Sequence, residues 1–243
     1  MAAEEPLEIR VDHHPISVTM RTPGHDGELA LGFLLSEGLL NTREELVKIE
    51  PYPRNEQRNV INVFLASGVV IDFAQLTRHV FASSSCGLCG KATIEAVHRH
   101  FDPLQSTVRV ASKILLGLPA QLSERQETFA RTGGLHAAAL FTIDGELVVS
   151  REDIGRHNAV DKVLGFGFLN GLLPFDRHIL LVSGRASFEI MQKALAARVP
   201  IVAAVSAPSS LAVQFATESG QTLVGFLRDE RMNLYSLPER IEF

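Results

Sequence analysis

Two cysteines lie three positions apart in the segment Ser-Ser-Ser-Cys-Gly-Leu-Cys-Gly-Lys, and Cys86 and Cys89 are the only cysteines of the chain. The glycines that follow them leave room for other molecules to reach the sulfurs. Residues 92–100 carry the pattern of a helix, and the positive end of its dipole favours a thiolate just before it. A thiolate is the form that attacks, carries sulfur or binds metal. The pair is therefore a candidate for thiol chemistry, with two inert, buried thiols as the alternative.

The composition is that of a soluble globular protein. The chain has 243 residues, of which 46% are hydrophobic and 21% charged, with a net charge of −5. The negative net charge does not favour nucleic-acid binding. No signal peptide is visible, and the longest apolar runs are too short to span a bilayer. We therefore expect a cytoplasmic protein with neither nucleic acid nor membrane as a partner, in which the thiols stay reduced.

The first part of the chain predicts a small α+β unit. Alternating apolar residues and a capped, helix-periodic stretch are its main signals. The expected strands are 7–11, 16–20, 59–66 and 69–73, with turns at 12–15 and 67–68 and one helix at 26–40. In this helix Asp26 is the expected N-cap and Gly38 the expected end. Residues 74–85 are expected to form a mobile lead into the cysteines.

From residue 133 onward, strands alternate with helices. The expected strands are 136–142, 146–150, 178–183, 201–206, 222–227 and 232–236, and the expected helices are 156–166, 187–198 and 209–219. Asp144-Gly145 indicates a hairpin. The alternation predicts a largely parallel sheet with helices on its faces, so the fold class is α/β with an α+β N-terminal part. We divide the chain into an N-terminal domain, 1–104, and a C-terminal domain, 105–243.

Ligands of open parallel sheets bind beyond the carboxyl ends of the strands. Three such ends carry polar or charged residues, at 151–158, 183–187 and 206–210. Candidate ligand contacts there are Arg156, His157, Ser183, Arg185 and Ser206. A guanidinium beside a helix N-terminus suits a phosphate, while plain helix capping is the alternative at each end. No P-loop or G-x-G-x-x-G motif is present. His157 could also be a general acid or base, and its role, like that of His136, stays open.

Segments from nearly the whole chain resemble the FdhD/NarQ family of formate dehydrogenase accessory sulfur carriers. The combination of Cys-Gly-x-Cys-Gly with Gly-Arg-His-Asn-Ala-Val-Asp-Lys, at 155–162, is the most specific part. The matching segments are 5–7, 20–24, 28–38, 86–90, 132–138, 152–162, 183–185, 205–209 and 225–228.

This resemblance implies a sulfurtransferase. Such proteins take persulfide sulfur from a cysteine desulfurase and pass it to the molybdenum cofactor, a bis(molybdopterin guanine dinucleotide), before that cofactor enters formate dehydrogenase. Carried over by position, Cys86 holds the persulfide and Cys89 assists or shuttles. The resemblance also implies a homodimer, a guanine nucleotide as a mimic of the cofactor, and a C-terminal cytidine deaminase-like mixed sheet flanked by helices. The family's C-terminal cofactor-binding segment corresponds to Phe226, Leu227, Arg228, Asp229, Glu230 and Arg231.

Two departures from the family concern the approach to Cys86 and the acidic residues of the C-terminal segment. Residues 83–85 vary among relatives, and Asp229 and Glu230 must point away from a polyphosphate. The division of roles between the two cysteines, the docking surface for the sulfur donor and the formate dehydrogenase that is served stay open.

Three other classes use similar residues. A zinc deaminase needs H-x-E before P-C-x-x-C, but Ala138 stands where His136 would need the glutamate, and the cysteines come first. A structural zinc site from Cys86, Cys89, His136 and His157, or a dithiol redox protein, is the remaining alternative. We expect no bound metal.

Overall fold

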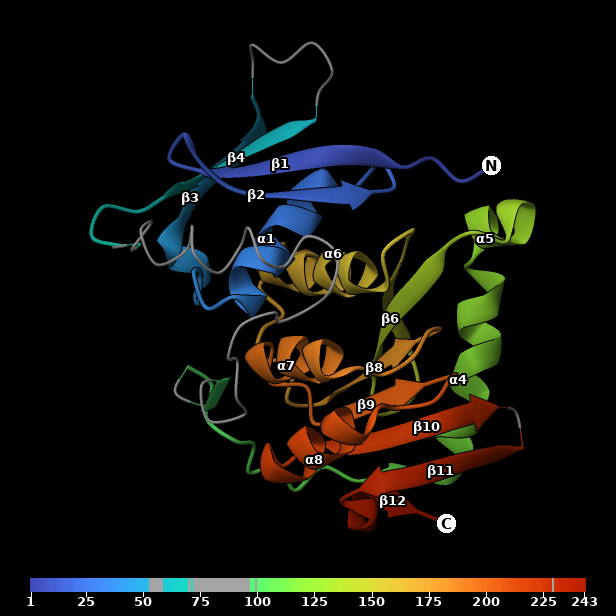
Figure 1. Cartoon of the computed structure of the whole chain (residues 1–243). Coiled ribbons are helices and arrows are strands. Elements are labelled where there is room, and N and C mark those ends of the chain that lie inside the picture. The colour runs from blue at the N-terminus through green and yellow to red at the C-terminus, as the bar shows by residue number, and fades with distance from the viewer. Residues whose placement is uncertain (53–58, 70, 72–96, 99, 229) are drawn as a thin grey trace.

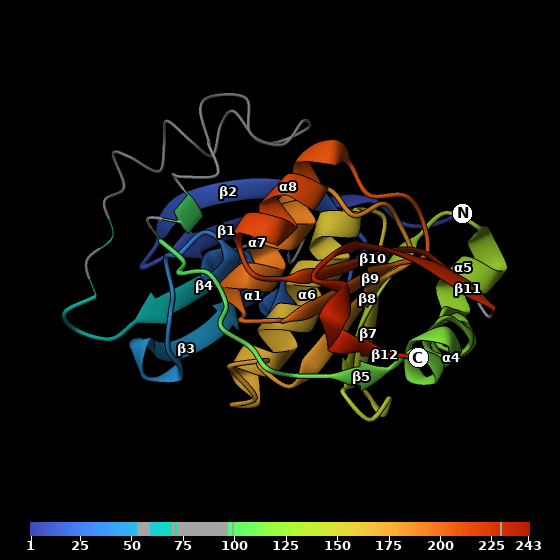
Figure 2. The same cartoon turned by 90° about the horizontal axis from the view of Figure 1, so that it is seen from below.

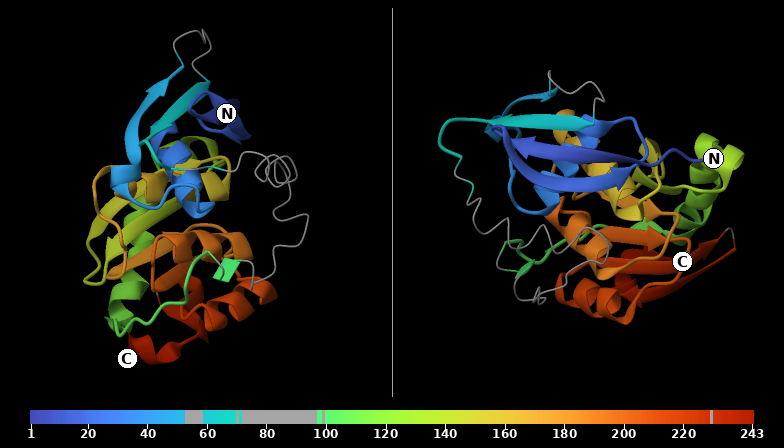
Figure 3. Two further views of the ribbon diagram at one scale, coloured as in Figure 1. Left: turned by 90° about the vertical axis from the view of Figure 1, so that its left-hand side faces the viewer. Right: turned by 45° about the horizontal axis from the view of Figure 1, so that its top comes forward.

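The computed structural model describes residues 1–52, 59–69, 71, 97–98, 100–228 and 230–243 (Figure 1). Two sheets dominate the described part, with helices packed between them and against the outer side of the larger sheet. The four-stranded sheet and the C-terminus lie at opposite ends of the molecule (Figure 3). The predicted lead at 74–85 lies outside the described residues. So does most of the helix predicted at 92–100, of which residues 97–98 are helical.

The four-stranded sheet has the order β2-β1-β4-β3. Its strands are β1 (Glu5–Val11), β2 (His14–Arg21), β3 (Leu46–Pro51) and β4 (Val60–Leu65). The hairpin of β1 and β2 is confirmed, and its turn uses left-handed backbone at Asp12 and His13, with φ of 45° and 71°. Strand β3, preceded by the 3₁₀ turn η1 (Arg43–Glu45), was not predicted. β4 pairs with β1 and β3, and the described residues of 69–73 lie in no strand.

The six-stranded sheet has the order β11-β10-β9-β8-β6-β7. Its strands are β6 (His136–Thr142), β7 (Leu147–Asp153), β8 (His178–Val182), β9 (Ile201–Ala204), β10 (Thr222–Arg228) and β11 (Arg231–Ser236). All six were predicted, but the largely parallel arrangement was wrong. Among the described strands of this sheet, parallel pairing is confined to β8, β9 and β10, because short hairpin turns add antiparallel strands at both sides.

The helices cover both faces of the larger sheet (Figure 2). Alternate residues of β6 separate the two cores: Ala138 and Leu140 face one, whereas Ala139 and Phe141 face the other. The first core also takes residues from α1 (Asp26–Ser36), α6 (Arg156–Leu169), α7 (Phe188–Ala196) and α8 (Ser210–Glu218). The second takes residues from α4 (Ser112–Glu124), from β5 (Val110–Ala111) and from β12 (Ile241–Glu242).

The ends of α1 differ partly from the prediction. His25, with φ of 57°, is the N-cap, and Asp26 lies in the first turn, where it pairs with Arg21. The helix ends at Ser36, and Gly38 follows in left-handed backbone as expected, with φ of 71°. Helix α4 and the 3₁₀ turn η2 (Pro238–Arg240) were not predicted, and the short α5 (Glu127–Thr132) ends just before Gly133.

Helix α1 packs directly on α6 through glycine. A Cβ on Gly32 would overlap the backbone carbonyl of Asp161, and a Cβ on Gly165 would overlap that of Glu28. Each helix therefore uses a glycine to admit the backbone of the other. The first core also contains residues of both predicted domains, such as Leu29 of α1 and Val160 of α6. The division into domains 1–104 and 105–243 stays a prediction.

Substituting alanine at these glycines tests the close approach. Gly32→Ala or Gly165→Ala should lower the free energy of unfolding by more than about 2 kcal/mol, because the added methyl meets backbone that must move. The matched control is Gly117→Ala within α4, where a Cβ would have nothing within 4 Å. It should raise stability by about 0.5–1 kcal/mol through helix propensity. Urea titrations measure all three, and equal effects at the three sites would contradict the packing.

Candidate functional site

The predicted ligand loops meet at one edge of the six-stranded sheet. β7 runs in the direction of β8 because both pair antiparallel with β6, so the carboxyl ends of β7, β8, β9 and β10 share this edge. The loops are also bonded to one another. Ser209 N donates to Ala186 O at 3.0 Å, and Phe226 N donates to Ser206 O at 3.1 Å. We call this edge, with the N-termini of α6, α7 and α8, the ligand edge.

Asp153 anchors the N-terminus of α6. Its carboxylate is fully buried and accepts hydrogen bonds from Gly155 N at 2.8 Å, Asn158 Nδ2 at 2.9 Å and Thr22 N at 3.1 Å. Lys162 Nζ pairs with it at 2.7 Å. One carboxylate therefore fixes the turn that carries Arg156 and also ties it to the loop after β2.

Arg151 and Glu152 have structural contacts, although they were grouped with the first ligand loop. β7 extends through both residues. Arg151 makes a two-pronged ion pair with Glu28, at 2.6 and 2.8 Å. The carboxylate of Glu152 accepts hydrogen bonds from the backbone of Thr128 and Phe129 at the start of α5. The loop proper therefore begins after Asp153.

Arg156 has unused hydrogen-bonding capacity at the ligand edge. Its Nε is buried and has no hydrogen-bond partner in the described part of the chain. A buried donor without a partner is unfavourable, and an incoming anion would satisfy it. Gly184 lies close by, since a Cβ there would be 3.8 Å from Arg156 Cβ and 3.2 Å from His136 Nδ1. A glycine thus brings the loop after β8 against the start of α6.

The ligand edge carries a positive field. Burial lowers the pKa of His136, and the charges of Arg156 and Arg185 lower it further. The Arg185 side chain is exposed, and Ser183 and Ser206 are partly buried. Ser183 Oγ accepts a hydrogen bond from Ala137 N at 2.8 Å. Two guanidinium groups therefore act on one imidazole, as expected of an anion site.

His157 is held by residues at the start of α7. Its Nε2 lies 3.3 Å from Ser187 Oγ and 3.9 Å from Glu189 Oε2. Burial, followed by the charges of Lys193 and Arg156, lowers the pKa of His157 to about 4. The ring is therefore neutral near pH 7, and offers one donor and one acceptor nitrogen instead of a positive charge.

The predicted segment 226–231 turns around the end of β10. Phe226 is 39% exposed and has a φ of 52°, an unusual backbone for an aromatic residue, within a bulge of the strand. Leu227 is fully buried in the second core, so its side chain faces away from solvent. Arg228 and Arg231 are register partners with exposed side chains, and Glu230 is also exposed. Asp229 lies outside the described residues.

Cys86 and Cys89 lie outside the described residues as well. Within the part that the structure describes, no group of three His, Cys, Asp or Glu side chains could hold a metal ion. The predictions about zinc at the cysteines therefore stay predictions. None of the described helices is both long enough and apolar enough to cross a membrane.

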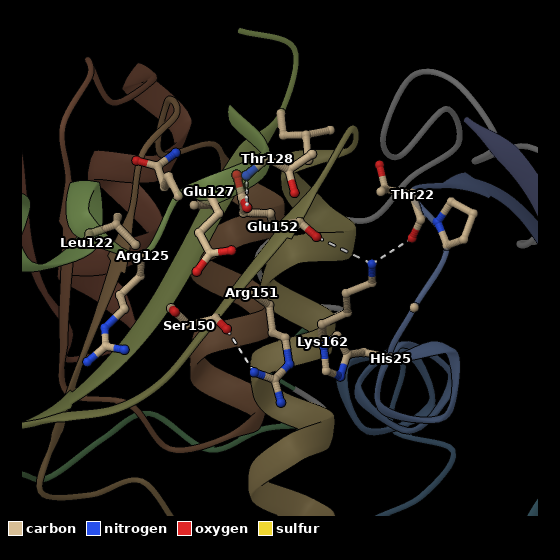
Figure 4. A pocket seen from close by; sticks show the side chains of 15 residues that line it. Thr22, His25, Leu122, Arg125, Glu127, Thr128, Ser150, Arg151, Glu152 and Lys162 are labelled. Carbon is tan, nitrogen blue, oxygen red and sulfur yellow. Dashed lines mark hydrogen bonds between the residues drawn. The ribbon is translucent and has the colours of Figure 1, made fainter. Parts of the chain in front are cut away.

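Two pockets adjoin the start of β6. The first, of about 310 Å³, lies between the loop after β2 and the α4–α5 connection (Figure 4). Two of the cationic side chains that line it already have partners: Lys162 Nζ donates to Thr22 O and to Glu152 O, and Arg151 donates to Ser150 O. The second, of about 520 Å³, is lined by His136 and Ser183 among other residues, so it opens onto the ligand edge.

The chain matches the model of the FdhD/NarQ family over residues 2–242. It belongs to this family. The resemblance drawn from the motifs is thereby confirmed. A relative in Mycobacterium tuberculosis, named sulfur carrier protein FdhD, is 51% identical over 251 residues, which cover 99% of this chain and 91% of that protein. A relative of the same name in Streptomyces avermitilis is 53% identical over 249 residues, with 99% and 88% covered.

A solved family structure has a similar fold. It is described as a putative formate dehydrogenase accessory protein from Desulfotalea psychrophila. The TM-score is 0.79 at 28% identity, with 99% of this chain and 90% of that one covered. The mixed α/β fold of the FdhD/NarQ chain is confirmed, and the cytidine deaminase-like character stays a prediction.

Several residues that shape the site were not predicted from the sequence. Asp153 was read only as part of a polar loop. Ser187 ends the predicted loop 183–187 and Glu189 matches an ordinary helix start, but nothing in their spacing shows that His157, thirty positions before Ser187, contacts Ser187. Asp153 ends β7 and stands two positions before Gly155, which is the one local signal for an anchoring carboxylate.

The low pKa of His157 predicts a loss of stability in acid. A histidine whose pKa falls from 6.5 to about 4 on folding stabilises the protein above pH 6.5, and this contribution is lost as the pH falls toward 4. His157→Gln should remove about 2 kcal/mol of this pH dependence, after allowance for partial exposure. The raised pKa of Asp161, about 6, acts in the opposite sense. Urea titrations from pH 4 to 7 should therefore compare variant with wild type, and a pH-independent difference would contradict the assignment.

Proposed function

We propose that this chain is a sulfur carrier that takes persulfide sulfur from a cysteine desulfurase onto Cys86 and delivers it to the molybdenum cofactor. The relatives named as sulfur carriers over nearly the whole chain support the sulfur-carrier role. Delivery takes place before the cofactor enters formate dehydrogenase, in line with the accessory role in the name of the solved relative.

The observation that carries the cofactor part of the proposal is the ligand edge. It combines helix N-termini, the charges of Arg156 and Arg185, and a buried guanidinium nitrogen without a partner. Phosphates of a guanine dinucleotide substrate suit this combination, because oxygen anions accept from guanidinium groups and from free helix N–H groups. The exposed Arg228 and Arg231 extend the positive surface around the end of β10. A guanine nucleotide is the expected mimic of the substrate.

Sulfur loading is a thiolate exchange. The Cys86 thiolate attacks the outer sulfur of the persulfide on the desulfurase and forms a new S–S bond. The desulfurase thiolate leaves with the electron pair of the broken bond, so no external oxidant or reductant is needed. Only two residues separate Cys86 from Cys89 in the sequence, so a second thiol is available nearby to accept or release the sulfur. We also propose that the protein works in the cytoplasm as a homodimer, with a cytidine deaminase-like C-terminal domain.

The first test is the mass of the peptide that contains Cys86. After incubation with an active cysteine desulfurase and cysteine, this peptide should gain one sulfur atom, which a reductant removes. Cys86→Ala should abolish the gain, while the matched Cys89→Ala should retain it on Cys86. If the Cys86 peptide of the wild-type protein gains no sulfur while the desulfurase is active, the mechanism is contradicted. One zinc per chain that is lost in Cys86→Ala would favour the structural zinc alternative.

The second test concerns the arginines after β10. Arg231→Ala should weaken binding of guanosine diphosphate about tenfold, the effect of losing one charged hydrogen bond, and should leave persulfide loading intact. Arg109→Ala is the matched control, because this exposed arginine pairs with Glu242 at the β5–β12 strands instead. Isothermal titration calorimetry measures both. Equal affinity of wild type and Arg231→Ala would refute the placement of the nucleotide.

A further inference from the structure

A buried ion pair joins three helices below the ligand edge. Lys193 of α7 donates to both carboxylate oxygens of Asp161 in α6, at 2.8 and 2.9 Å. Lys193 also donates to Ser36 Oγ, at the end of α1, at 2.9 Å, and that hydroxyl lies 3.2 Å from Asp161 Oδ1. The exposed fractions are 8% for Lys193, 2% for Asp161 and 0% for Ser36.

The same two helices, α6 and α7, carry the ligand edge at their N-termini. Helix α6 begins with Arg156 and His157, and α7 follows directly on the loop with Arg185. The helices are therefore connected twice: at the edge by the approach of His157 to Ser187, and about one turn deeper by the ion pair.

We propose that Lys193 and Asp161 are positioning residues that hold the N-termini of α6 and α7 at the separation that a phosphate-bearing ligand needs. The inference rests on the proposed function, because it assumes that the ligand binds at this edge. Neither residue contacts the ligand. The pair acts through Arg156 and His157 on one side and through Arg185 on the other.

The geometry favours positioning over stability as the role of the pair. A buried ion pair contributes little net stability, because removing both charges from water costs about as much as their attraction returns. A two-pronged contact nevertheless fixes the relative placement of its partners. Neutral side chains of similar size should therefore preserve the fold and loosen the spacing of the two helix ends.

Lys193 also acts on His157 electrostatically. The charged groups that face His157 are Lys193 and Glu189 of α7, Arg156 of its own helix and His136 of β6. Those that face Asp161 are Lys193 of α7 and Glu37 beyond α1. Among the charges around His157, that of Lys193 has the largest effect on its pKa after burial. Removing the Lys193 charge should thus be visible in the titration of His157, with or without a ligand.

The test uses the full-length double variant Lys193→Met/Asp161→Asn. Its affinity for guanosine diphosphate, by calorimetry, should fall about tenfold. The pKa of His157, followed by NMR, should rise from about 4 but stay below 6.5, because burial persists. The control is Lys48→Met/Glu50→Gln, which removes an exposed pair of 3.0 Å on β3 and should change neither quantity.

Unchanged affinity and unchanged His157 titration in a folded double variant would overturn the inference. If the double variant does not fold, Lys193→Gln/Asp161→Asn replaces it, since the two amides can keep a hydrogen bond while both charges are gone. Wild-type protein that fails to bind guanosine diphosphate would contradict the proposed ligand. The His157 titration would then decide alone whether Lys193 acts on the edge, and an unchanged pKa would overturn that link.

Discussion

The direct contact of α1 with α6 is the constraint on which the rest of the structure depends. Because Gly32 and Gly165 lack side chains, the backbones of the two helices touch, and the four-stranded sheet is brought close to the helix layer of the larger sheet. Only at this spacing can Ser36, at the end of α1, reach the pair of Asp161 and Lys193. Two glycines therefore decide where a buried charge network can form.

The N-terminal part of the chain, which packs on α6 through α1, also helps to position the ligand edge. The loop between β2 and α1 donates Thr22 N to Asp153, and Asp153 in turn fixes the turn that begins α6. The position of Arg156 thus depends on residues from two distant parts of the chain. The unpartnered Nε of Arg156 contrasts with the complete pairing of Lys162 and Arg151 nearby. Lys162 and Arg151, which hold the fold together, are paired, whereas Arg156 at the ligand edge has a nitrogen without a partner.

The sequence predicts those parts of the fold in which the pattern is local. Every strand of the six-stranded sheet follows from apolar runs and turn residues, and four helices, α1, α6, α7 and α8, follow from the spacing of their apolar residues and from polar or glycine residues at their ends. Helix α4 was not predicted, because it contains Pro119. Strand β3 was not predicted, because its exposed and half-buried residues alternate weakly. The direction of the strands was wrong because hairpins at both sides of the sheet add antiparallel neighbours. For the site, the convergence of the loops can be predicted from the sequence, because ligands of such sheets bind beyond the carboxyl ends of the strands. The pairing of Asp161 with Lys193, 32 positions apart, cannot, since nothing local links them.

The central claim is that a phosphate-bearing substrate binds at the carboxyl ends of β7, β8, β9 and β10. A crystal structure with guanosine diphosphate tests it most directly. We expect phosphate oxygens at about 2.7–3.2 Å from Arg156 Nε and from the first backbone N–H groups of α6. A nucleotide bound away from this edge, with Arg156 Nε still without a partner, would contradict the claim.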